Sequence, residues 1–156
     1  MNKNAIPFGQ NSEISSGVRV DKISGRRYHT IGKDEESEGS TIVVLGIDPG
    51  YALMGWGVVE YNGGRMKLLG YGCVETRAGT PMQHRLRTLL MGVRDLVNIY
   101  HPDDVAFEEL FFARNVTTAL MVGAARGAAI IAATEYTENL YEYTPMQIKQ
   151  AVTGYG

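Results

Sequence analysis

Two acidic residues stand at the ends of apolar segments that have the composition of buried strands. Asp48 follows the aliphatic run 41–47 and precedes a Pro-Gly pair that turns the chain away, and Glu108 follows a second apolar run. An ionised carboxylate at such a position is costly to desolvate unless a cation meets it. The alternative is that Asp48 only forms a turn, as Asp often does before Pro-Gly.

The alternation of side chains along a strand decides which acids can meet. Only one of Glu108 and Glu109 can share a face with Asp48, and Glu108 lies on the face opposite Phe107. If the two strands pair in parallel, Asp48 and Glu108 meet at neighbouring strand ends. Two carboxylates repel each other unless a proton or a hard divalent cation lies between them, and their oxygens suit Mg²⁺ or Mn²⁺. Ions held in this way can split a phosphodiester. The alternative is that Glu108 and Glu109 are solvated edge residues.

Residues that could bind nucleic acid follow the second acid. Phe111 could stack on a base, and Arg114 and Asn115 could hold a phosphate at the start of a helix. In the alternative interpretation the aromatic residues of this loop pack into the core. Lys149, on the last helix, is either part of the same site or an ordinary exposed lysine.

The elements that must position these residues are read from the apolar pattern. It predicts three strands, then a helix, a strand, a helix, a strand and a last helix. The expected strands are 41–47, 53–61, 65–76, 104–110 and 139–143, and the expected helices run from Pro81 to about 100, over 116–134, and from Pro145 to about 153. This order predicts an α/β fold, in which helices flank a mixed five-stranded sheet. Right-handed crossovers are compatible with the fourth and fifth strands lying on the side of the first.

The first and last helices carry the same capping signal. The runs Thr80-Pro81-Met82-Gln83 and Thr144-Pro145-Met146-Gln147 each offer Thr as N-cap, Pro at the first helical position and Gln at the third. In such a capping box the Thr side chain and the Gln side chain satisfy free backbone amides reciprocally.

The segment 116–134 has Arg126 as its only charge. Its many Ala, Gly and Thr residues and its central Arg disfavour insertion into a membrane. Small residues such as Gly123 and Gly127 would let another backbone approach closely. The sequence leaves two alternatives open, a subunit interface and burial within the chain.

Composition excludes several classes of protein. The 156 residues carry 15 basic and 17 acidic side chains, a net charge of −2. The chain as a whole therefore has no net positive charge that would attract nucleic acid or anionic lipid, and any such contact would need a local basic patch. A single cysteine, Cys73, excludes an internal disulfide, and the chain has no apolar signal segment, so we expect a cytoplasmic protein. Residues 1–40 are rich in charge and poor in apolar residues, which predicts a disordered extension before a domain at 41–156.

The motifs taken together resemble a known family, the RuvC Holliday junction resolvases of bacteria. The similar runs, in the same order, are Leu45-Gly46-Ile47-Asp48-Pro49-Gly50, Gly55-Trp56-Gly57-Val58, the stretch 106–115, Ala124-Ala125-Arg126-Gly127, Gln147-Ile148-Lys149-Gln150 and Gly154-Tyr155-Gly156. The resemblance implies a ribonuclease H-like fold and a homodimer that nicks two strands of a four-way DNA junction symmetrically with Mg²⁺. It also implies the branch-migration complex RuvA–RuvB as partner, and no membrane.

The resemblance also assigns roles to individual residues. Asp48 and Glu108 correspond to two of the family's metal-binding acids, Phe111 to an aromatic that contacts junction bases, and Lys149 to a basic residue near the cleaved strand. The family has no counterpart of residues 1–40, and it continues with a basic segment and a last helix that supply two more acids. We therefore expect a domain incomplete at its C-terminus, with the last helix missing and the chain inactive as written.

The sequence leaves two other functions as alternatives. One is a non-catalytic dimer module that binds junction DNA through Phe111, Arg114 and Lys149. The other is an actin-like nucleotide phosphatase or kinase that uses the loop at Asp48 on phosphate, but it lacks a second Gly-rich phosphate loop.

Overall fold

The structure is a computed structural model that describes residues 18–21, 40–110 and 116–154. Its strands are β1 (Val18–Asp21), β2 (Ile42–Asp48), β3 (Leu53–Asn62), β4 (Arg65–Glu75), β5 (Asp104–Glu108) and β6 (Leu140–Tyr143), and its helices are α1 (Met82–Tyr100), α2 (Val116–Thr134) and α3 (Pro145–Thr153). The strands form one sheet in the order β1-β4-β3-β2-β5-β6. All five expected strands are present, although β5 ends at Glu108 rather than at residue 110.

The sheet is mixed, as predicted. β2, β3 and β4 form an antiparallel meander, and β5 and then β6 are added in parallel on the β2 side. The β3–β4 turn is made by Gly63 and Gly64, both with positive φ, a conformation that tight hairpin turns require and glycine adopts readily. This arrangement brings the ends of β2 and β5 to one edge of the fold.

The prediction that residues 1–40 are disordered is wrong at residues 18–21. These residues form β1, which pairs antiparallel with β4 so that Val18 lies opposite Val74 and Asp21 opposite Tyr71. The physical reason is that β4 would otherwise present a row of unpaired backbone groups, and a Val-x-Val segment is well suited to add a strand there. The rest of that segment, residues 1–17 and 22–39, lies outside the described residues.

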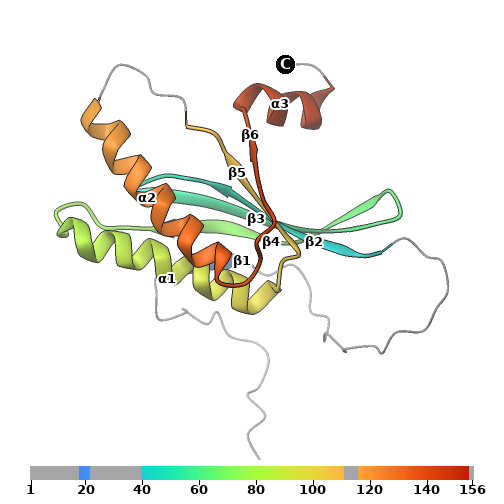
Figure 1. Cartoon of the computed structure of the whole chain (residues 1–156), viewed down its shortest axis with the longest axis horizontal. Helices are drawn as coiled ribbons and strands as arrows, with labels where there is room; N and C mark the ends of the chain where they lie inside the picture. Colours follow the sequence, from blue (N-terminus) through green and yellow to red (C-terminus); the bar gives the residue numbers. More distant parts are fainter. Residues whose placement is uncertain (1–17, 22–39, 111–115, 155–156) are drawn as a thin grey trace, which may run out of the picture.

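Two helices cover one face of the sheet (Figure 1). α1 and α2 lie against each other there, while α3 lies apart from them at the end of β6. The core between the helices and the sheet takes alternate residues of the strands and the inner stripe of α1: Leu45, Ile47, Met54, Trp56, Val58, Val105, Phe107, Leu89, Val93, Leu96 and Val97. Strand residues of the opposite parity therefore point to the other, open face of the sheet.

The two capping signals have different outcomes. At α3 the predicted capping box is confirmed, since Thr144 accepts from the Gln147 amide and the Gln147 side chain accepts from the Thr144 amide. At α1 the prediction is wrong, because Pro81 is the N-cap and no side chain caps the helix. The Thr80 amide donates to the Arg77 carbonyl in a turn, and Pro81 after it is extended. Thr80 therefore lies one residue before the N-cap position.

The two faces of α2 lie in different environments. It is apolar and long enough to cross a membrane by length and composition alone, but it packs on α1 with four alanines buried. Its single charge is compensated, since Arg126 forms an ion pair with Glu142 of β6 and lies 5.8 Å from the centre of the Phe107 ring. The opposite stripe leaves Val116, Leu120 and Ile131 exposed. Burial within the chain thus accounts for one face only.

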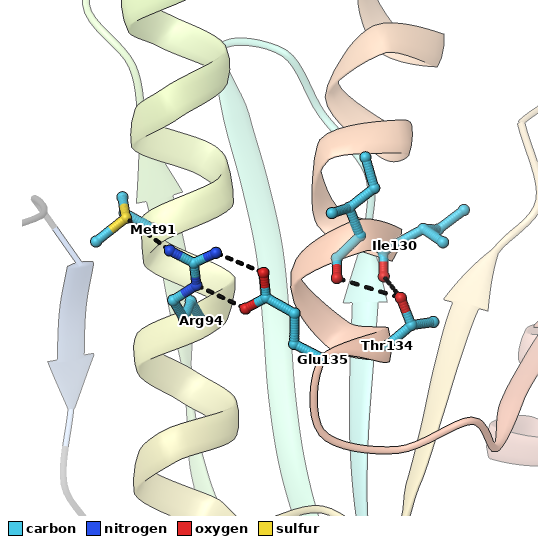
Figure 2. A network of polar contacts seen from close by, with 6 residues as sticks. Met91, Arg94, Ile130, Thr134 and Glu135 are labelled. Atoms are coloured by element: carbon cyan, nitrogen blue, oxygen red, sulfur yellow. Dashed lines mark hydrogen bonds and ion pairs between the residues drawn. The ribbon is translucent and has the colours of Figure 1, made fainter.

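An ion pair joins α1 to the end of α2 (Figure 2). Arg94 donates from Nε and Nη2 to the two carboxylate oxygens of Glu135, at 2.7 and 2.5 Å, and from Nη1 to the Met91 sulfur at 3.6 Å. The hydrogen bond from Arg94 and its positive charge lower the pKa of Glu135. Thr134, just before Glu135, turns its hydroxyl back to the Ile130 carbonyl.

We predict that Glu135→Gln lowers stability in a pH-dependent way. A carboxyl whose pKa is lowered by folding contributes stability above its unfolded pKa, and this contribution is lost as pH falls through the lowered folded pKa. The urea midpoint of the variant should be below that of the wild type at about pH 6.5, and the difference should close toward about pH 3. Glu138→Gln, at an exposed acid, is the control. A difference of equal size at both pH values would contradict this account.

A second prediction concerns the contact of β4 with α1. A Cβ added at Gly70 would lie 2.3 Å from the Tyr100 hydroxyl and 3.0 Å from its ring carbon, so Gly70→Ala should destabilise by about 1–3 kcal/mol. Gly57→Ala is the matched control, because a Cβ there meets nothing within 4 Å. In urea unfolding, Tyr100→Phe should recover part of the Gly70→Ala loss, since it removes the closest atom. Additive losses would contradict the contact.

Candidate metal centre

The structure places Asp48 and Glu108 at the ends of neighbouring parallel strands. Ile47 of β2 lies opposite Phe107 of β5, so the next residue of each strand is one of these acids. Both Ile47 and Phe107 are buried under the helices, so Asp48 and Glu108 belong to the open face of the sheet. The parallel pairing that the sequence analysis set as a condition is present, and the choice of Glu108 over Glu109 agrees with this placement.

The electrostatics of Glu108 reflect both neighbours. Burial raises the pKa of its carboxyl, the negative charge of Asp48 raises it further, and the positive charge of Lys149 lowers it. Glu108 of β5 is therefore influenced by the charge of one acid on β2 and of one lysine on α3. Like charges held this close favour either a shared proton or a bound cation.

Glycines on the neighbouring strand keep the space over Asp48 open. Gly55 of β3 lies opposite Asp48, and a Cβ there would stand 3.5 Å from the Asp48 Cβ and 3.8 Å from its Oδ2. A larger side chain would extend from that Cβ across the carboxylate. Gly57, two residues further along the same face, has nothing within 4 Å of an added Cβ. Oxygen donors with free approach from solvent fit a hard divalent ion that keeps several waters.

α3 and β6 supply the other side of the site. Tyr143 of β6 pairs with Glu108, and its carbonyl accepts from the Glu109 amide at 2.9 Å. Directly after it the capping box at Thr144 starts α3, which carries the exposed Lys149. Tyr143 was not among the candidates read from the sequence. The argument from the alternation of side chains, applied to a β6 that pairs in parallel with β5, would have identified it.

Three sequence candidates cannot be placed. Phe111, Arg114 and Asn115 lie outside the described residues, so their proposed contacts with DNA stay predictions. Within the described part of the chain, no group of three or more His, Cys, Asp or Glu side chains is arranged to hold a metal ion. The candidate centre therefore consists of two carboxylates, with Lys149 beside them.

The loop after Asp48 is tightly turned. A Cβ at Gly50 would lie 1.8 Å from the Leu53 carbonyl oxygen, so only glycine fits at this position. Pro49, before it, is buried. The Pro-Gly pair noted in the sequence thus reverses the chain within four residues and leaves Asp48 at the edge of the sheet.

Comparison with known proteins gives a consistent picture. A family model described as crossover junction endodeoxyribonuclease RuvC matches residues 44–156. The protein of that name from Alkaliphilus metalliredigens is 46% identical over 115 residues, which are 74% of this chain and 70% of the relative. The one from Rubrobacter xylanophilus is 52% identical over 114 residues, which are 73% of this chain and 64% of the relative.

Two solved structures share the fold, and one of them is also similar in sequence. The Thermus thermophilus RuvC in complex with a Holliday junction substrate is 40% identical, with a TM-score of 0.69 over 74% of this chain and 70% of that one. The yeast mitochondrial Holliday junction resolvase Ydc2, at 14% identity, shares the fold alone, with a TM-score of 0.53 over 70% and 55% of the two chains. Because the family model spans most of the sequence and the relatives are this similar, the chain belongs to the RuvC family of crossover junction endodeoxyribonucleases.

Proposed function

We propose that this domain nicks four-way DNA junctions by metal-dependent hydrolysis, with Asp48 and Glu108 as ligands of Mg²⁺ or Mn²⁺. The observation that carries the proposal is the placement of two carboxylates at adjacent ends of β2 and β5, where burial and the charge of Asp48 raise the pKa of Glu108. Support for the substrate comes from the Thermus relative, which is described in complex with a Holliday junction.

Each residue of the centre has a distinct task in this proposal. Asp48 and Glu108 present oxygens on the open face of the sheet, and Gly55 leaves the approach to Asp48 free for a phosphate group. Lys149 adds a positive charge that the phosphate would meet on the α3 side. A divalent ion held by the carboxylates would stabilise the charge that develops on the phosphate oxygens and lower the pKa of an attacking water.

We further propose that two copies act together through α2. The residues Val116, Leu120, Gly123, Gly127 and Ile131 recur at helical spacing along the face of α2 opposite its buried alanines. The three large members are exposed, and a Cβ added at either glycine meets nothing within 4 Å. A second copy of the helix could therefore approach closely. Cooperation with RuvA–RuvB remains part of the proposal by resemblance alone.

One observation favours a second candidate function. The described residues bring together two carboxylates rather than a larger cluster. A centre of this size could position DNA without cutting it, which corresponds to the non-catalytic junction-binding module. The expected inactivity of the chain stays a prediction.

A junction assay separates the two candidates. We expect residues 1–156 to bind a mobile four-way junction more tightly than a linear duplex of the same sequence, with or without Mg²⁺. Any paired nicks should require the metal and fall by about 100-fold or more in Asp48→Asn, because one ligand of the centre is lost. Binding without nicks would favour the second candidate. Equal binding to junction and duplex would contradict both.

A thermal shift assay tests the metal centre without DNA. Mg²⁺ or Mn²⁺ at ten times its Kd should stabilise the chain by about 1.4 kcal/mol, or about 4 °C in Tm. The effect should weaken as pH falls, because the raised pKa of Glu108 lets protons compete with the metal at higher pH than for an ordinary Glu. Asp48→Asn and Glu108→Gln should abolish the shift, while Glu138→Gln should keep it. Equal shifts in all four proteins would contradict the site.

A further inference from the structure

The short loop that carries Asp48 away from the sheet is held by residues distant in sequence. It runs over residues 49–52, between the end of β2 and the start of β3. Pro49 and Gly50 set its path. The next residue, Tyr51, is half-buried, and its carbonyl points to two side chains from other elements.

The first of these side chains belongs to the end of the sheet. Thr76, directly after β4, donates from its hydroxyl to the Tyr51 carbonyl at 2.7 Å. Its backbone amide donates to the Ala52 carbonyl at 2.9 Å. Thr76 thus binds two successive carbonyls of the loop.

The second side chain is Arg85, in the first turns of α1. Its Nε donates to the Thr76 hydroxyl at 2.8 Å and its Nη2 to the Tyr51 carbonyl at 3.3 Å. Its guanidinium carbon also lies 3.8 Å from the centre of the Tyr51 ring, in cation–π geometry. Arg85 therefore contacts Tyr51 from two sides and orients the Thr76 hydroxyl as well.

The described partners of Arg85 are neutral groups rather than carboxylates. In the part of the chain that the structure describes, no carboxylate forms an ion pair with Arg85, which is itself half-buried. All of its described contacts go to neutral groups of the loop and of the residue that binds the loop. Hydrogen bonds from a charged donor are stronger than neutral ones of the same geometry, so Arg85 adds a charge-assisted contact to the neutral ones that Thr76 makes with the loop.

We propose that Arg85 is a positioning residue for the metal centre. It fixes Tyr51, and through the two residues between them it fixes the main chain of Asp48 against the end of β5. The carboxylate is then held where it can share an ion with Glu108. This inference rests on the proposed function, because it assumes that Asp48 is a metal ligand.

The test compares three variants of the full chain. Arg85→Met keeps the apolar stem and removes every donor, and Arg85→Lys keeps the charge but not the fork of donors. Arg87→Met, at an exposed arginine of the same helix, is the matched control. Two quantities are measured for each: hydrogen exchange of the amides of residues 50–52 and 76, and the Kd for Mn²⁺ by water-proton relaxation.

We expect Arg85→Met to speed exchange at these amides by about tenfold, with slow core amides unchanged. Its Kd for Mn²⁺ should rise by about tenfold, as expected when a residue that supports a metal ligand is lost. Arg85→Lys should fall between the wild type and Arg85→Met in both measurements. Arg87→Met should match the wild type.

The possible failures are distinguishable. Unchanged loop exchange in Arg85→Met would show that Arg85 does not hold the loop. Faster exchange with an unchanged Kd would show that the loop does not position Asp48, and either result would overturn the inference while the metal centre stands. If Asp48→Asn binds Mn²⁺ as tightly as the wild type, the proposed centre itself is wrong, and positioning of a metal ligand by Arg85 is wrong with it.

Discussion

The parallel pairing of β2 with β5 is the constraint on which the rest of the structure depends. Its register places Ile47 opposite Phe107, and both of these side chains lie in the core. The two acids that follow them, Asp48 and Glu108, therefore lie on the opposite face of the sheet. A shift by one residue would bury a carboxylate and expose a core residue. The same apolar packing that stabilises the sheet therefore fixes where the two acids lie.

Much of this arrangement could be predicted because it depends on local periodicity. Alternation along β5 was enough to predict that Glu108, and not Glu109, shares a face with Asp48. The element order was compatible with β5 and β6 lying beside β2, and the structure shows that pairing. The capping box at Thr144 also depends on four consecutive residues, and it is present. Signals of this kind need no knowledge of distant contacts.

Of the features that sequence reasoning missed, β1 and the contacts of Arg85 depend on distant partners, whereas the lost cap at Thr80 depends on a local turn. β1 forms because β4 offers it an edge, and nothing within residues 18–21 indicates that partner. The cap at Thr80 is displaced by a turn that begins at Arg77. Arg85 is one of several arginines in the chain, and only the approach of α1 to the loop after Asp48 distinguishes it from Arg87.

The added strand β1 has a consequence for how the domain behaves when shortened. β4 spans eleven residues, and its exposed side chains include Met66, Leu68 and Tyr71. β1 pairs only with residues 71–74 of β4, so without residues 18–21 the backbone groups of that stretch would become free beside the exposed Tyr71. A version that begins near residue 40 would therefore expose a longer strand edge, and long exposed edges favour association between copies.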